Sequence, residues 1–175
     1  MITVRRIPMD DPLFAQAVDL RRRVLLDPVG WSYEDYLDES PGREEQCHHF
    51  VALADHPEGP RVVGVAMLLP GGGDGLTAPG APTDAGTVGK VLQVAVDRQM
   101  HGQGIGRKLM VSIEAFAFAP DERGGLGLDG LYCHAQQTAI GFYDRLGWAI
   151  ESDEFDEAGI VHKRMGIRAP GADTG

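Results

Sequence analysis

The chain has 175 residues, of which 43% are hydrophobic and 24% are charged, and its formal net charge at pH 7 is -10. This length predicts one globular domain with its own core, and the composition is ordinary for such a domain. The acidic balance argues against a protein that binds nucleic acid through phosphate contacts, because such binding needs a basic surface. It favours a cationic or amine-bearing partner, although an acidic surface is equally typical of proteins without one.

The two cysteines, Cys47 and Cys133, form neither a disulfide framework nor a metal-ligand spacing. We therefore expect reduced structural thiols in a cytoplasmic protein that holds no metal. The N-terminal segment has no apolar stretch of signal-peptide length. The longest apolar run, Val62–Leu69, is too short to span a bilayer, so no membrane association is expected.

The first 45 residues predict a strand and a helix. Ile2–Ile7 alternates between apolar and polar residues, as a strand does. Asp11 and Pro12 are typical of the N-cap and first position of a helix, and apolar residues then recur at helical spacing to about Leu26. Gly30–Glu45 is rich in aromatic and acidic residues and is either a short helix or a loop over a cleft.

Three strands are predicted in the middle of the chain. Phe50–Ala54 and Arg61–Leu69 are separated by a turn sequence and are expected to form a hairpin. Pro70–Gly89 is a low-complexity stretch that cannot order itself by burying apolar surface, so it is a mobile surface loop or, alternatively, a substrate lid. Lys90–Val96 is the third strand.

The C-terminal half predicts two helices and three strands. A helix with one apolar face begins near Ile105 and ends before Pro120. The elements after it are expected to be a strand, a short helix and two closing strands, over Leu131–Ala135, Thr138–Leu146, Trp148–Phe155 and Val161–Ile167. Residues 1–168 are thus predicted to form a single domain and residues 169–175 a frayed tail. The element order implies a mixed sheet with helices on its faces.

Val94–Met110 is the most informative segment of the chain. A β-branched run is followed by Gly102, Gly104 and Gly106 in alternation and then by the apolar pattern of a helix. A turn of this kind points several backbone N–H groups at one place, and the helix dipole adds partial positive charge there. Glycine permits left-handed backbone and the close approach of an anion. The segment therefore predicts a site for a phosphate or pyrophosphate.

Two common phosphate-binding motifs do not fit this turn. A P-loop requires a hydroxyl residue after its lysine, and Leu109 follows Lys108 here. The dinucleotide fingerprint requires a third glycine, and counting from Gly102 that place is taken by Arg107. The turn instead resembles motif A of the GNAT superfamily of acetyl-CoA-dependent N-acetyltransferases, [Q/R]-x-x-G-x-[G/A], although His101 takes the place of Gln or Arg.

A second and a third stretch extend this resemblance. Gln136–Trp148 resembles the family's motif B, N-x-x-A-x-x-F-Y-x-x-x-G-[FW], with Gln136 in place of Asn. Within it, Phe142 occupies a core position, whereas the adjacent Tyr143 points about 100° away around the helix, at the ~3.6 residues per turn of an α-helix. The ending resembles that of the ElaA-like subgroup, with its acid-Gly-Ile-x-His-x-x-Met pattern matched by Glu157, Gly159, Ile160, His162 and Met165.

The resemblance implies an α/β (α+β) GNAT fold, with a central mixed, mostly antiparallel sheet flanked by helices and a splayed strand at the acetyl-CoA site. It implies that pantetheine lies along Leu92–Val96, that the amide near Val94 polarises the acetyl oxygen, and that the glycine turn holds the pyrophosphate. The implied cofactor-binding residues are Val94, Ala95, Val96, His101, Gly102, Gln103, Gly104, Ile105, Gly106, Arg107, Gln136 and Tyr143.

The resemblance also implies a reaction in which a primary amine of a small molecule or peptide attacks acetyl-CoA directly. Tyr143 is the candidate general acid, because a phenol stays protonated at neutral pH; it could also simply pack against the cofactor. His134 is a candidate general base on the same strand face as Gln136, and Glu157 and His162 are the subgroup's candidates on the acceptor side. Each histidine could equally be structural.

The sequence leaves one functional alternative open, namely a non-catalytic acyl-CoA-binding sensor or interaction module that keeps the glycine turn. The identity of the acceptor amine and the oligomeric state, a homodimer included, are open as well.

Overall fold

The structure is a computed structural model, and it describes residues 1–72, 78–81 and 87–172. Half of the predicted loop or lid at Pro70–Gly89 lies outside the described residues, and so does the end of the predicted tail. Contacts group the chain into two compact units, and each is described by itself. Unit 1 comprises Met1–Leu69 and Leu92–Ile113, and unit 2 comprises Pro70–Val91 and Glu114–Gly175.

Unit 1 contains three strands and three short helices before the chain leaves it. These elements are β1 (Ile2–Ile7), α1 (Phe14–Arg21), α2 (Tyr33–Glu39), α3 (Arg43–Gln46), β2 (His48–Ala54) and β3 (Arg61–Pro70). The stretch Gly30–Glu45, for which a short helix or a loop was expected, thus contains two short helices. Ser32 begins α2 with a capping box, in which its hydroxyl and the Asp35 carboxylate each accept a bond from the other residue's N–H.

The predicted first helix is present, but its ends differ from the prediction. Asp11 accepts a bond from the Leu13 N–H at 2.9 Å, and α1 begins only at Phe14. The helical path continues to Leu26 as predicted, although its last turn, Arg22–Leu26, is π-helical and is followed by a 3₁₀ turn at Asp27–Val29.

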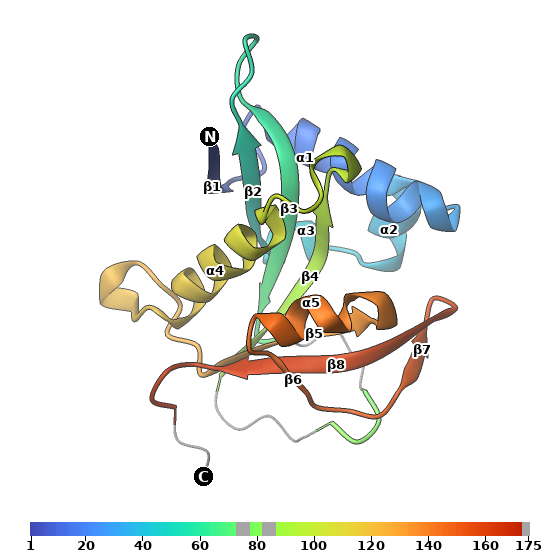
Figure 1. The fold of residues 1–175 in the computed structure, drawn as a ribbon, viewed down its shortest axis with the longest axis vertical. Coiled ribbons are helices and arrows are strands. Elements are labelled where there is room, and N and C mark those ends of the chain that lie inside the picture. The colour runs from blue at the N-terminus through green and yellow to red at the C-terminus, as the bar shows by residue number, and fades with distance from the viewer. Residues whose placement is uncertain (73–77, 82–86, 173–175) are drawn as a thin grey trace. The chain divides into compact units, whose positions relative to one another are not determined.

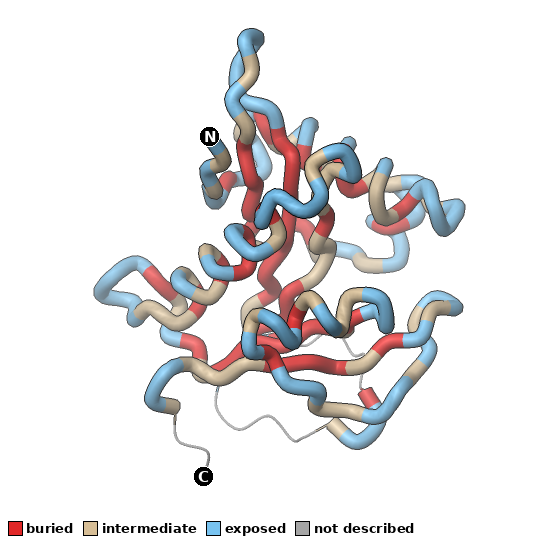
Figure 2. The backbone as a smooth tube through the Cα atoms, viewed as in Figure 1, coloured by how far each residue is buried: buried red, intermediate tan, exposed pale blue. Residues whose placement is uncertain are grey.

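The strands β1, β2 and β3 lie side by side and are antiparallel (Figure 1), with Ile2 opposite Ala54 and Phe50 opposite Ala66. β2 and β3 are buried over most of their length (Figure 2), which fits their long apolar runs. Leu20 of α1 packs into the same core as Val51 and Val65.

Unit 2 contains the C-terminal strands and one short helix. Its elements are β5 (Gly130–Gln136), α5 (Ile140–Arg145), β6 (Ala149–Ile150), β7 (Phe155–Glu157) and β8 (Ile160–Arg168), with 3₁₀ turns at Asp121–Arg123 and Gln137–Ala139. The prediction of one strand over Trp148–Phe155 is wrong, because the polar residues between β6 and β7 interrupt it. There the Ser152 hydroxyl accepts the bond from the Arg164 N–H. Ala169, in the predicted tail, donates its N–H to Asp129.

The elements β4 (Val88–Val96) and α4 (Ile105–Phe118) run through both units, and the last residue of β3, Pro70, belongs to unit 2. Hydrogen bonding connects the strands in the order β1-β2-β3-β4-β5-β8-β6, and β7 pairs with β8. β4 and β5 are parallel over Val88–Lys90, whereas β5 and β8 are antiparallel. The predicted mixed, mostly antiparallel sheet with flanking helices is therefore confirmed. No helix in the described parts of the chain is long and apolar enough to cross a membrane.

Candidate functional site

The glycine turn of unit 1 is built by its backbone and by two local side chains. After β4, Asp97 begins a 3₁₀ turn at Arg98–Met100 by accepting a bond from the Gln99 N–H at 3.0 Å. His101 follows, and its Nε2 donates to the Val96 carbonyl at 3.1 Å. His101, which replaces the Gln or Arg of motif A, thus stabilises the turn through its side chain. The turn itself is exposed to solvent.

Two positions of this turn favour glycine because of their backbone conformation, not because a side chain would clash there. Gly102 and Gly104 have φ angles of 78° and 73°, and a Cβ on either would meet no atom within 4 Å. The first α-helical bond runs from the Lys108 N–H to the Gly104 carbonyl. The N–H groups in the turn of helix before Lys108 therefore lack acceptors within the helix, which is what an anion-binding helix start requires.

The side chains of the first turn of α4 divide into buried and exposed ones. Ile105 and Leu109 are buried and lie within reach of Gly64 on β3, whereas Arg107 is exposed. Lys108 is also exposed, and its Nζ donates to the Ile2 carbonyl at 3.2 Å. Of these two basic residues, Arg107 makes no hydrogen bond or ion pair with the described residues of this unit.

β4 has an unusual backbone at Gln93, immediately before the predicted pantetheine-binding residues. Its φ of 53° lies in the left-handed region, which a non-glycine residue adopts only where the surrounding structure enforces it. Val94 and Val96 are half-buried, while Ala95 between them is buried. Local distortion of this kind is typical of functional sites.

Unit 2 brings together three of the four predicted catalytic residues. His134 Nδ1 lies 3.0 Å from Glu157 Oε1, and the other carboxylate oxygen of Glu157 lies 3.7 Å from His162 Nε2. The His134 side chain is only 3% exposed. A fourth group, Lys90 Nζ, lies 3.3 Å from His134 Nδ1. We call these four residues the acid–base cluster.

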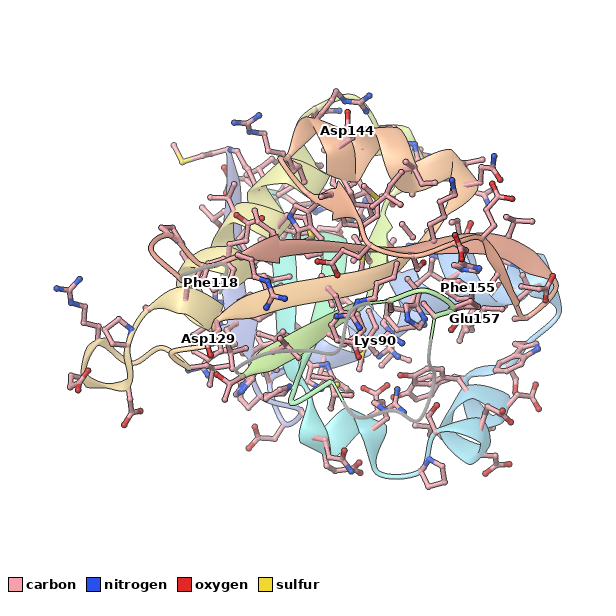
Figure 3. The ribbon with its side chains drawn as sticks, turned by 90° about the horizontal axis from the view of Figure 1, so that it is seen from below. Lys90, Phe118, Asp129, Asp144, Phe155 and Glu157 are labelled. Atoms are coloured by element: carbon pink, nitrogen blue, oxygen red, sulfur yellow. The ribbon has the colours of Figure 1, made fainter. Side chains whose placement is uncertain are left out.

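Figure 3 shows where this cluster lies in unit 2. Lys90, Phe155 and Glu157 gather on one side of β5 and β8, and Asp144 of α5 lies on the other. The Phe155 ring packs edge-on against His134, with the ring centroids 4.9 Å apart, and stacks with His162 at 6.0 Å. The Phe155 ring therefore covers both histidines of the cluster.

The charge of Glu157 is set by the cluster itself. Burial alone would raise the pKa of Glu157, but the hydrogen bond from His134 and the electrostatic interactions with His134, Lys90 and His162 outweigh burial and lower it. Glu157 is therefore ionised at neutral pH. His162 Nδ1 donates to the Ile160 carbonyl at 2.7 Å, which directs its Nε2 toward Glu157.

Lys90 is the member of the cluster that the sequence reasoning missed. It lies opposite Tyr132 in the parallel pairing of β4 and β5, and it is 5% exposed. A lysine is almost never fully buried without a partner. The sequence does contain a signal for this residue, because Lys90 is a charged residue within the largely apolar strand β4.

Tyr143, the fourth predicted catalytic residue, lies on the opposite face of β5. Its hydroxyl interacts with the Cys133 thiol, and Cys133 points away from its neighbour His134 because side chains alternate along a strand. Burial and Cys133 raise the pKa of Tyr143 well above its ordinary value, so the phenol remains protonated. Gln136, at the end of β5, is exposed.

Both cysteines are free and buried, as the sequence predicts. Within residues 1–72, 78–81 and 87–172, no group of three or more histidine, cysteine or acidic residues could hold a metal ion.

Comparisons with known proteins agree with this architecture. Two Bacillus subtilis proteins are similar to the chain. The first, YyaT, is 27% identical over 164 residues, which cover 94% of this chain and 94% of YyaT. The second, named as an acetyltransferase, is 25% identical over 94% of this chain and 95% of its own.

Solved structures share the fold. A Lactobacillus plantarum protein described as an N-acetyltransferase has a TM-score of 0.71 at 21% identity, with 97% of this chain and 99% of that chain covered. Escherichia coli ElaA has a TM-score of 0.64 at 18% identity, covering 95% and 99%. The model of the acetyltransferase (GNAT) family matches residues 15–148, more than half of the chain. The chain therefore belongs to the acetyltransferase (GNAT) family, whose members transfer acetyl groups from acyl-CoA.

Proposed function

We propose that this protein is an acetyl-CoA-dependent N-acetyltransferase whose acceptor is a primary amine of a small molecule or peptide. The observation that carries the proposal is the buried acid–base cluster around His134, in a chain whose family transfers acetyl groups. A protein that only bound acyl-CoA would need the glycine turn but no such cluster. The two free cysteines support the further expectation that the protein is cytoplasmic.

The glycine turn supplies the proposed site for the cofactor's pyrophosphate. The N–H groups of Gln103, Gly104, Gly106 and Arg107 would bind it, supported by the dipole of α4. The pantetheine would bind the β4 backbone after Gln93, with the Val94 N–H donating to the acetyl oxygen as negative charge develops there. The left-handed backbone at Gln93 supports this assignment, because it sets the direction of the next peptide group.

His134 is the proposed proton acceptor. An amine reaches the enzyme mainly as ammonium and must lose a proton before its nitrogen can attack the thioester carbonyl. Since Nδ1 of His134 donates to the Glu157 carboxylate, the neutral imidazole has its lone pair at Nε2, which can take that proton. Glu157 thus fixes the tautomer and orientation of the base, as the carboxylate of a Ser-His-Asp triad does.

Tyr143 is the proposed proton donor to the departing sulfur. As the amine nitrogen bonds to the carbonyl carbon, the carbon–sulfur bond breaks and the sulfur takes the phenolic proton. The raised pKa of Tyr143 keeps that proton in place until then. Gln136, at the exposed end of β5, would bind pantetheine.

The proposal is tested first by binding and then by turnover. Acetyl-CoA at about 100 times its Kd should stabilise the protein by roughly 2.7 kcal/mol. For a chain of this length that corresponds to a rise in melting temperature of roughly 5–10 °C. NAD and ATP should have no effect. If no CoA ester raises the melting temperature, both the transferase and the sensor hypotheses fail.

Turnover then separates the two hypotheses. Release of free CoA thiol is measured with a library of amino acids, amino sugars, polyamines and peptide N-termini. Replacing His134 with Gln or Tyr143 with Phe should lower turnover by roughly 10²–10⁴-fold, the usual contribution of an acid or base. Acetyl-CoA binding should persist in both variants. The control is His56→Gln, in the hairpin turn of unit 1, which should leave turnover unchanged. Binding without turnover for any amine would favour a sensor.

A further inference from the structure

A buried polar cluster in unit 1 has no part in the mechanism proposed above. Arg21 of α1 and Glu44 of α3 are 2% and 1% exposed, and they share two hydrogen bonds of 3.1 and 2.7 Å. The third guanidinium nitrogen, Nε of Arg21, donates to Oε1 of Gln93 at 3.3 Å. Gln93 is the β4 residue with left-handed backbone. A buried ion pair is thus bonded directly to a strained position of the strand.

Two aromatic rings hold the Arg21 guanidinium from its other side. Tyr33 and Tyr36 of α2 are stacked, with ring centroids 6.2 Å apart, and the Arg21 Cζ lies 5.6 and 4.9 Å from the two centroids. The guanidinium is therefore in cation–π distance of both rings. The Tyr36 hydroxyl is buried and has no hydrogen-bond partner among the described residues. What Tyr36 contributes to this cluster is consequently its ring.

Glu44 is fixed in turn by β2. His49 Nε2 donates to the Glu44 backbone carbonyl at 2.8 Å. The His49 ring packs edge-on against Phe14 of α1, with centroids 5.1 Å apart. Contacts from α1, α2, α3 and β2 thus converge on Arg21 and leave its Nε pointing at β4.

Two features that lower the stability of the fold occur together here, namely the buried Arg21–Glu44 ion pair and the left-handed backbone of Gln93. Burying an ion pair gives no advantage in stability over apolar side chains of similar volume, because both charges lose their hydration. A left-handed non-glycine residue within a strand is also unfavourable. A geometric requirement accounts for both, since a guanidinium fixed on one side by Glu44 and on the other by aromatic rings can hold the side chain of Gln93 in one place.

We propose that Arg21 is a positioning residue that, through Gln93, fixes the β4 backbone and the direction of the Val94 N–H. Glu44 and the Tyr36 ring hold Arg21 for this purpose. The inference rests on the proposed function, which assigns the Val94 N–H to the acetyl oxygen. Its structural part, the dependence of the Val94 amide on Gln93 and Arg21, can be measured without substrate.

The decisive variant is Gln93→Met, which removes the acceptor of the Arg21 Nε and leaves the Arg21–Glu44 pair intact. The amide hydrogen of Val94 should exchange at least ~10-fold faster. With a reactive amine, kcat should fall by roughly 10–100-fold, a part of what losing an oxyanion donor costs. The Kd for CoA without an acetyl group should stay within about twofold. Gln93→Glu keeps an acceptor and should recover most of kcat.

Tyr36 provides the matched pair of controls. Tyr36→Phe retains the ring and should leave the Val94 amide and kcat as in the wild type, whereas Tyr36→Leu should reproduce the effects of Gln93→Met. An unchanged Val94 amide in Gln93→Met would overturn the inference, and so would equal damage by Phe and Leu at position 36. If the Val94 amide responds as expected but the wild type acetylates no amine, the proposed function fails and the positioning role stands.

Discussion

Gly64 of β3 tests how closely the first turn of α4 packs within unit 1. A Cβ at this position would lie 2.8 Å from Ile105 Cγ2, 3.0 Å from Leu109 Cδ1 and 3.2 Å from Ala52 Cβ. Carbon atoms pack best at about 3.5–4.0 Å, so Gly64→Ala forces α4 and β2 apart by several tenths of an ångström. The φ of Gly64 lies outside the left-handed region, so alanine meets no backbone obstacle.

The expected cost of Gly64→Ala follows from two opposing effects. Overpacking a close-packed site costs about 1–3 kcal/mol. Alanine also lowers the conformational entropy of the unfolded chain relative to glycine, which stabilises the folded protein by about 0.4–1 kcal/mol. We therefore expect a net loss of about 1–2 kcal/mol, and thermal unfolding should show a melting temperature lower by roughly 2–8 °C. Since Ile105 follows the glycine turn, the KM for acetyl-CoA should rise as well.

Gly141→Ala is the matched substitution with the opposite expected sign. Gly141 lies in α5 on an exposed helical surface, where the nearest atom to a new Cβ would be Arg145 Nη1 at 3.4 Å. Alanine is favoured over glycine inside a helix by about 0.8–1.0 kcal/mol. The variant should therefore melt at a higher temperature than the wild type. The reasoning is refuted if Gly64→Ala is as stable as the wild type, or if both variants shift in the same direction.

Two further predictions concern ionisation. Because the pKa of Glu157 is lowered from its ordinary 4.5, its ionised form stabilises the fold above that pH, and this stabilisation is lost as the pH falls through the folded pKa. The melting-temperature difference between wild type and Glu157→Gln should therefore be largest above about pH 5 and shrink in acid; a constant difference contradicts it. Burial raises the pKa of Cys47 and Cys133 to about 12, so a thiol reagent at neutral pH should label neither in the folded protein and both after unfolding. Labelling of the folded protein would refute this.

The parts of the fold that the sequence predicts are those decided locally. Strand alternation identifies β1, the apolar run identifies β3, and the glycine turn with its helix is encoded within one short segment. The interruption between β6 and β7 is decided elsewhere, because the Ser152 hydroxyl accepts from Arg164 of β8. The alternation after Trp148 contains no sign of that partner, and so one continuous strand was predicted.

The same distinction applies to the candidate site. His134, Glu157 and His162 are predicted together through the family resemblance, and Glu157 lies against both histidines in the structure. Lys90 and Arg21 were missed because their partners depend on tertiary structure. Lys90 joins the cluster through the parallel pairing of β4 with β5, and Arg21 contacts a residue 72 positions along the chain.

The register of β5 and β8 determines which residues of unit 2 lie in its apolar core and which lie on the face of the acid–base cluster. Directly paired residues point to the same face of a sheet, so His134, Arg164 and His162 share the face of the acid–base cluster. Cys133 and its partner Met165 point the other way and are buried, as is Tyr143, which lies beside Cys133. A slip of one residue would move every one of these side chains to the opposite face. The apolar residues that oppose such a slip therefore keep His134 and Tyr143 on opposite faces of β5, although none of them belongs to the acid–base cluster.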